Sequence, residues 1–158
     1  MGFQTTGTAS EFFAVDASKV TSIPEEMSYE EGAMIEPLAV AVHAVKQVGD
    51  VTGMNIAVLV AVFAGMAEID LAVANDHELD IKSTMMYRHD DYIDAIQLVN
   101  EDKVHLRPLI SKTFPFKDYL KAYQYIDDNR ETTMKVIINV RRNRLFNKLI
   151  FRLNTDIL

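Results

Sequence analysis

The sequence predicts an α/β fold, in which strands alternate with amphipathic helices. Three observations lead to this prediction. An apolar run extends from Ile56 to Met66 and suits a buried strand. Residues 89–102 and 117–129 repeat apolar side chains at helical spacing, and the short apolar run at 133–140 suits a closing strand. This order of strands and helices, with strands that look buried, is typical of α/β proteins.

The first third of the chain is predicted to hold one strand and two helices. Apolar and polar residues partly alternate near the N-terminus, which predicts a strand from Phe12 to Val15. Ser28 precedes two glutamates and fits a helix start, because acidic side chains are favoured near the positive end of the helix dipole. A second helix is expected from Pro37 to Val48, where its apolar stripe ends at Gly49.

The remaining elements follow from the same kinds of pattern. Residues 78–87 are predicted to form a strand, and 89–102 a helix that opens with aspartates. The segment 106–116 is expected to be extended and interrupted by its two prolines. The helix at 117–129 and the strand at 133–140 complete the order.

Composition limits the class of protein. A chain of 158 residues, 49% apolar and 25% charged, suits one ordinary globular domain. No apolar run approaches 18 residues, and the N-terminus lacks a basic region followed by an apolar core. We therefore expect neither a membrane span nor a secretory signal, and a cytoplasmic location. Because there is no cysteine, any metal site must use His, Asp and Glu.

The net charge of −7 is unevenly distributed. Residues 141–158 contain five of the 16 basic side chains and one of the 23 acidic ones, which leaves 11 basic and 22 acidic side chains over 1–140. Such an acidic body argues against binding to nucleic acid.

The C-terminal tail, residues 141–158, is predicted to form a basic amphipathic helix. Its apolar face consists of Leu145, Phe146, Leu149, Ile150 and Leu153. Such a helix suits an anionic membrane or the groove of a partner. The alternatives are an unselected extension and a cover for apolar surface of the chain itself, and we favour these two over membrane or partner contact.

Two stretches of the chain resemble the zinc-containing medium-chain dehydrogenases, in the polyol (sorbitol and xylitol) dehydrogenase branch. The first, residues 10–45, ends in "IEPLAVAVHAV", and the second, 78–140, runs from "ELDIKSTMMY" to "KVIINV". The resemblance implies an oxidoreductase acting on CH–OH groups with NAD and zinc. It also implies an incomplete version of that architecture: a remnant of a GroES-like catalytic domain, a truncated Rossmann-like sheet and the tail helix.

The resemblance divides the chain into four segments. Residues 1–48 correspond to a remnant of the catalytic domain with its connecting helix, and 106–140 to the return into that domain. Residues 49–105 correspond to a truncated Rossmann-like portion, and 141–158 to the tail. In the truncated portion "NIAVL" resembles the first nucleotide-binding strand and "VAVFAGMAEIDLAV" a much later one, which implies a deletion seam at Leu59–Val60. A parallel crossover needs about a dozen residues, and none lie between these two halves.

The resemblance also supplies candidate site residues. Glu36 matches the acidic residue of the family's zinc site, and Tyr87 matches the tyrosine of an Arg-Tyr pair that binds polyol hydroxyls. Met86 replaces the arginine, and Arg88 is a poor substitute because a shift of one residue along a strand points to the opposite face. Gly65 lies where the family's nicotinamide would approach. The plain interpretations, which we favour, are an ordinary acid beside a helix-starting proline for Glu36 and a chain-turning glycine for Gly65.

Other polar residues suggest sites more weakly. The aspartates at 90, 91 and 94 suggest a cation site, although a helix N-terminal turn is the interpretation we favour. The four histidines are scattered without ligand spacing, and we expect structural or surface roles for them. The tyrosines at 119, 123 and 125 are expected to be core or surface aromatics.

We therefore expect a relative of the polyol dehydrogenases that binds neither zinc nor NAD tightly and transfers no hydride. The family's zinc-binding Cys and His and its glycine-rich phosphate loop have no counterpart in this sequence. The alternative is a non-catalytic interaction protein, forming homo- or hetero-oligomers with intact dehydrogenase subunits or touching a membrane through 141–158. A third alternative is a mis-spliced or degenerate gene product.

Overall fold

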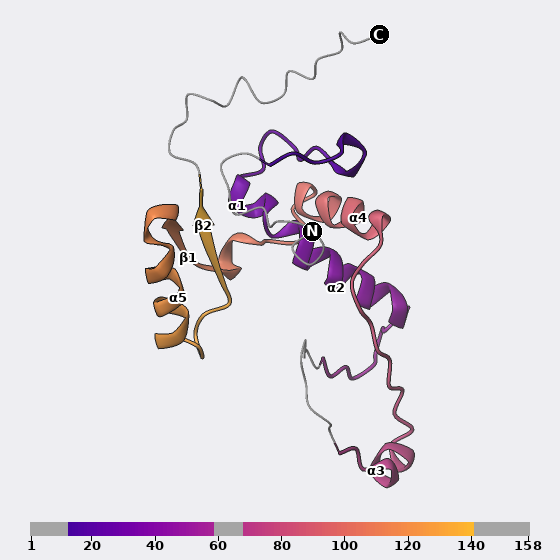
Figure 1. The fold of residues 1–158 in the computed structure, drawn as a ribbon. Coiled ribbons are helices and arrows are strands. Elements are labelled where there is room, and N and C mark those ends of the chain that lie inside the picture. Colours follow the sequence, from indigo (N-terminus) through magenta and orange to yellow (C-terminus); the bar gives the residue numbers. More distant parts are fainter. Residues whose placement is uncertain (1–12, 59–67, 141–158) are drawn as a thin grey trace. The chain divides into compact units, whose positions relative to one another are not determined.

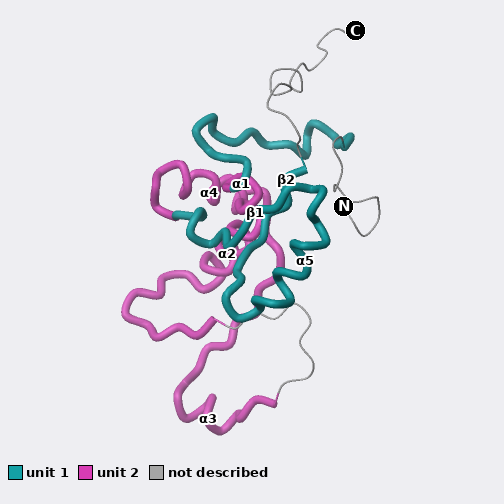
Figure 2. Tube along the Cα trace, turned by 90° about the vertical axis from the view of Figure 1, so that its left-hand side faces the viewer, with its two compact units in different colours: residues 1–30, 105–158 teal, residues 31–104 magenta. Residues whose placement is uncertain are grey.

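The computed structural model describes residues 13–58 and 68–140 (Figure 1). The chain divides into two compact units, distinguished by colour in Figure 2. Unit 1 comprises residues 1–30 and 105–158, and unit 2 comprises residues 31–104. The predicted tail helix, Gly65 and the predicted seam at Leu59–Val60 all lie outside the described residues.

Unit 1 contains a strand–helix–strand crossover. Strands β1 (Ile110–Pro115) and β2 (Lys135–Asn139) are parallel, and α5 (Tyr119–Asp128) connects them and packs against both. Ala122 of α5 is buried, at 1% exposed. Parallel neighbours require a crossover connection of this kind. The structure therefore confirms the α/β class as a mixture of helices with a small parallel sheet.

Short helical turns complete unit 1. Turns η1 (Ala17–Lys19), η2 (Arg107–Leu109) and η3 (Phe116–Asp118) are 3₁₀ helices. Pro108 lies within η2, and Pro115 is the last residue of β1. Both prolines therefore interrupt the extended segment 106–116, as the sequence predicts. Helix α1 (Tyr29–Gly32) begins directly after Ser28, which confirms the predicted helix start.

Unit 2 is organised by two helices that pack against each other, α2 (Ile35–Val48) and α4 (His89–Asn100). Their buried side chains, at i and i+4 on each helix, are Ile35 and Ala39 of α2 and Asp91 and Ala95 of α4. The small alanines allow the helix axes to approach closely. Pro37 is tolerated in the first turn, where backbone N–H groups have no helical partner, and Gly49 ends α2 at a φ of 84°. A third helix, α3, spans Leu71–Asp76.

Three predicted strands are wrong within the described residues. Residues 13–15, 55–58 and 78–87 have irregular backbone, because the only ladder in the described part of the chain joins β1 to β2. A strand needs a neighbour to accept its hydrogen bonds, and alternation in sequence does not supply one. In 78–87 the φ angles of Glu78 (49°) and Met86 (60°) also lie in the left-handed region, which strands do not use.

Candidate functional site

Glu36 and Tyr87, distant in sequence, both belong to unit 2, where the charge of Glu36 acts on the Tyr87 phenol. Glu36 lies in the first turn of α2, and Tyr87 precedes α4 by two residues. The ring of Tyr87 is tilted against that of Tyr92, with 6.1 Å between their centroids. The pKa of both phenols is raised, chiefly by burial and to a smaller extent by the negative charge of Glu36. The charge effect requires the carboxylate and the two phenols to lie near one another.

Tyr92 is the member of this group that the sequence analysis missed. It was assigned only to an amphipathic helix, whereas the structure pairs it with Tyr87 across the start of α4. Arg88 is the N-cap residue of α4. Tyr87 and Tyr92 therefore occupy the N′ and N4 positions, whose side chains form the contact called a hydrophobic staple. That spacing is the sequence signal that would have predicted the pair.

Asp91 is engaged by protein groups from two helices. Its buried carboxylate, 2% exposed, accepts hydrogen bonds of 2.8 Å from Lys46 Nζ, His43 Nδ1 and the backbone N–H of Arg88. Lys46 also forms an ion pair with Asp94. These contacts support the interpretation of the aspartates as a helix start, because both carboxylates already bind protein cations.

The residues present do not fit the family's zinc site. Over 13–58 and 68–140, no three His, Asp or Glu side chains are grouped closely enough to hold a metal ion. A catalytic zinc needs three protein ligands, and Glu36 supplies one carboxylate in a sequence that contains no cysteine.

Arg88 was predicted to be a poor substitute for the missing arginine because it was expected to lie in a strand, and this expectation is wrong. Residues 84–88 do not form a strand, and Met86 has a φ of 60°. Both side chains are exposed, and the Arg88 backbone N–H caps α4 through Asp91. The opposite-face rule for strands therefore does not apply to Met86 and Arg88.

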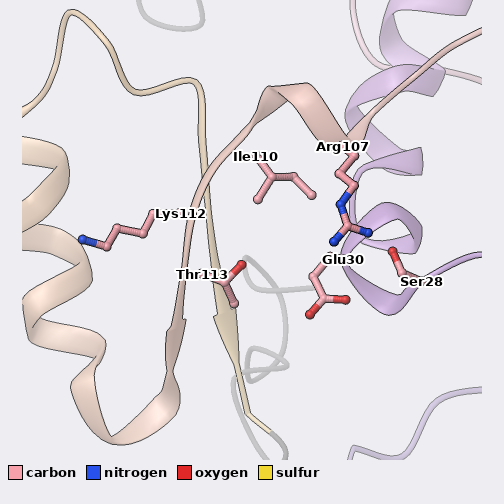
Figure 3. Close-up of a pocket in the computed structure, with 6 residues that line it drawn as sticks. All are labelled: Ser28, Glu30, Arg107, Ile110, Lys112 and Thr113. Carbon is pink, nitrogen blue, oxygen red and sulfur yellow. The ribbon is translucent and has the colours of Figure 1, made fainter.

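Unit 1 contains a separate hollow of about 380 Å³. It is lined by Ser28, Glu30, Arg107, Ile110, Lys112 and Thr113. Figure 3 shows Arg107 directed toward Glu30 and Ser28, whereas Lys112 is turned toward α5. The Lys112 ammonium lies 4.5 Å from the ring centroid of Tyr125, a cation–π contact. None of the candidate residues from the sequence analysis lines this hollow.

The described residues contain no helix with the length and apolarity needed to span a bilayer.

Comparison with known proteins shows that parts of this chain are similar to dehydrogenases. A scan against models of known protein families finds no match. Among curated proteins, sorbitol dehydrogenases, a xylulose reductase and a threonine dehydrogenase match parts of the chain at 30–35% identity. These relatives confirm the resemblance to the polyol branch of the zinc-containing medium-chain dehydrogenases.

Individual relatives each match a limited part of the chain. Sorbitol dehydrogenase 1 of Saccharomyces cerevisiae is 35% identical over 68 residues, 43% of this chain and 19% of that protein. D-xylulose reductase of the same yeast is 30% identical over 82 residues, 51% of this chain and 23% of the relative. L-threonine 3-dehydrogenase of Protochlamydia amoebophila is 31% identical over 99 residues, 56% of this chain and 29% of that protein. The chain spans about a fifth of the length of the first two relatives.

Replacing Glu36 by glutamine is expected to lower the pKa of both Tyr87 and Tyr92. The neutral amide removes a negative charge that disfavours phenolate formation. Titration of the tyrosine ring signals by NMR measures the two values separately. Glu101→Gln, at the opposite end of α4, is the matched control and is expected to leave both unchanged. Unchanged phenol titration in Glu36→Gln would contradict the proximity of the three groups.

Acid is expected to weaken the contact between α2 and α4 through Asp91. The ammonium of Lys46, then the Arg88 N–H, hold the pKa of this carboxyl far below its ordinary value near 4. Since the folded pKa is depressed, the stabilisation is fully present above about pH 4 and is lost progressively as the pH falls toward the folded pKa. Circular dichroism during acid titration measures the loss, which should be absent in Asp91→Asn.

Proposed function

We propose that this chain is a relative of the NAD- and zinc-dependent polyol dehydrogenases. It retains part of the polyol-binding site but does not catalyse hydride transfer. The observation that supports the retained part is the cluster of Glu36, Tyr87 and Tyr92. Two of its members match positions to which the resemblance gives zinc and polyol roles. A carboxylate accepts hydrogen bonds and a phenol donates and accepts them, so together they suit polyol hydroxyls.

The lack of hydride transfer follows from groups that the 158 residues do not contain. The cysteine of the zinc site is absent, and Glu36 alone leaves zinc without its ligand set. Dinucleotide binding uses a glycine-rich turn at the start of a helix, which holds the pyrophosphate. Gly65 is the single glycine after residue 53, so no such turn is available beyond "NIAVL".

The activity part of the proposal is tested on the purified full chain with Zn²⁺, NAD and sorbitol or xylitol. We expect no formation of NADH and no thermal shift on adding NAD, because a ligand stabilises a protein only by binding its folded state. Zinc-dependent turnover that disappears in Glu36→Gln would overturn the proposal.

The substrate part is tested separately by NMR. Xylitol is expected to shift the ring signals of Tyr87 and Tyr92, and Glu36→Gln is expected to abolish those shifts. The rings of Tyr119 and Tyr123 in unit 1 serve as internal controls. Equal responses at all four rings, or none at any, would contradict a retained polyol subsite.

A second candidate function is association with intact dehydrogenase subunits, and one observation favours it. Between residues 54 and 86, many large apolar side chains are more than half exposed. They include Met54, Val58, Leu71, Ile81 and Met85. Large apolar side chains left exposed to solvent favour association with a partner that covers them. A partner subunit would cover these side chains and supply hydrogen-bond partners to the irregular backbone around them.

Co-expression tests this second candidate. The full chain is expected to co-purify with yeast sorbitol dehydrogenase, and Ile81→Asp is expected to abolish the association. Lys82→Asp, at the neighbouring exposed position, is the control for added negative charge. Absence of association, or equal association of the two variants, would count against this function.

A further inference from the structure

The hollow in unit 1 is built from three segments of the chain (Figure 3). Ser28 and Glu30 lie at the start of α1, Arg107 begins η2, and Ile110 and Thr113 belong to β1, which is held by its pairing with β2. The volume of about 380 Å³ falls at the lower end of the range for small-molecule sites, about 300–1,000 Å³. The hollow therefore has room for a small ligand.

Glu30 and Arg107 carry the charges that the hollow presents. Figure 3 shows the Arg107 side chain directed toward Glu30. Among the residues that the structure describes, neither of these side chains forms a hydrogen bond or an ion pair. Lys112, the third charged residue of the lining, is engaged elsewhere, because its ammonium lies 4.5 Å from the ring centroid of Tyr125. The hollow therefore offers one negative and one positive group to a ligand.

These two groups select a ligand by its charges. A guanidinium donates paired, charge-assisted hydrogen bonds to a carboxylate, and a carboxylate accepts such bonds from an ammonium group. A ligand with only a carboxylate would pair with Arg107 but would meet the like charge of Glu30, and a ligand with only an ammonium group would be repelled by Arg107. A ligand that carries both groups on one carbon atom avoids both repulsions.

The uncharged part of the lining indicates the rest of the ligand. Ser28 and Thr113 provide hydroxyl groups, which can both donate and accept hydrogen bonds, and Ile110 adds one aliphatic side chain. This lining suits a short polar group better than a long apolar or aromatic one.

We propose that the hollow binds a small polar α-amino acid such as serine. Arg107 holds the α-carboxylate, Glu30 holds the α-ammonium group, and the hydroxyl groups of Ser28 and Thr113 serve the side chain. Each charge of the ligand is then paired with an opposite charge. All the lining residues belong to unit 1, so this inference does not rest on the polyol proposal, which concerns the cluster around Glu36 in unit 2.

NMR titration of the full chain with three matched ligands tests the charge requirement. Serine carries both charged groups, 3-hydroxypropionate lacks the ammonium group, and ethanolamine lacks the carboxylate. We expect serine to shift backbone amide signals within 28–30 and 107–113, with a dissociation constant on the order of 1 mM, ordinary for so small a ligand. The other two ligands are expected to bind at least about tenfold more weakly, because each faces a like charge in the hollow.

Single substitutions test the two charged residues separately. Arg107→Gln and Glu30→Gln are each expected to weaken serine binding about tenfold, because a charged hydrogen bond is lost. Each should also improve the binding of one other ligand. Glu30→Gln should bind 3-hydroxypropionate more tightly than the natural chain does, and Arg107→Gln should do the same for ethanolamine, gains that a misfolded variant would not produce. Arg130→Gln and Glu131→Gln, at exposed positions of unit 1 outside the hollow, are matched controls and should leave serine binding unchanged.

The outcomes separate the possible ligands of the hollow. Serine binding that is the tightest of the three, and that both variants weaken, supports the proposal. If 3-hydroxypropionate binds at least as tightly as serine, the hollow is a plain anion site, and if ethanolamine does, it is a cation site; either result overturns the proposal. So does an absence of shifts with serine at tens of millimolar, or serine binding that is unchanged in either variant.

Discussion

Replacing Ile35 by alanine is expected to lower the free energy of unfolding by about 3 kcal/mol, which is ordinary for a large aliphatic side chain lost from a packed core. Ile35 is the largest side chain in the described residues with no exposed surface. It begins α2, one turn before the buried Ala39, in the region where α2 packs on α4. Truncation therefore removes buried apolar contacts and leaves a cavity that the neighbouring helix cannot readily fill.

Urea denaturation followed by circular dichroism measures this change. Val45→Ala is the matched control, because Val45 lies in the same helix but is 61% exposed. The control is expected to change stability by less than about 0.5 kcal/mol. If Ile35→Ala and Val45→Ala have equal effects, the packing of α2 on α4 does not contribute to the folded state as described.

Asp91→Asn is expected to cause the second large loss, a fall in melting temperature on the order of 5 °C or more. The amide has nearly the shape of the carboxylate but no negative charge. It leaves the Lys46 ammonium with a weaker partner and provides a poorer acceptor for the Arg88 N–H. Because Asp91 is 2% exposed, water cannot replace these hydrogen bonds efficiently.

Asp94→Asn separates the role of burial from that of charge. Asp94 also pairs with Lys46, but its side chain is 45% exposed. Surface ion pairs contribute little, so the melting temperature is expected to fall by less than about 2 °C. Thermal unfolding at neutral pH compares the two variants. Similar losses would show that the Lys46 charge, rather than the buried position of Asp91, is what matters.

The hydrogen bonds of Asp91 join two helices that are distant in sequence. The opening aspartates predicted the start of α4 correctly, because negative charge is favoured at a helix N-terminus. The spacing of the histidines does not indicate a role for His43, and no sequence pattern distinguishes Lys46 from the other lysines. Both lie one helix away, and sequence spacing does not report which side chains a second helix brings against the first. The contact between Tyr92 and Tyr87 likewise became apparent only from the positions of the two rings in the structure.

The sequence by itself predicted helices at 37–48, 89–102 and 117–129 and a closing strand at 133–140, and the structure has each of them with ends shifted by a few residues. Apolar periodicity and helix caps act within one segment, which is why they could be predicted. It also determined the resemblance to polyol dehydrogenases through "IEPLAVAVHAV" and the residues after 78. Only the tertiary structure decided which apolar runs became strands. A ladder formed where α5 brought β1 and β2 together, whereas 78–87 has no partner strand. Only the structure placed Glu36 near Tyr87, since that proximity depends on how α2 packs against α4.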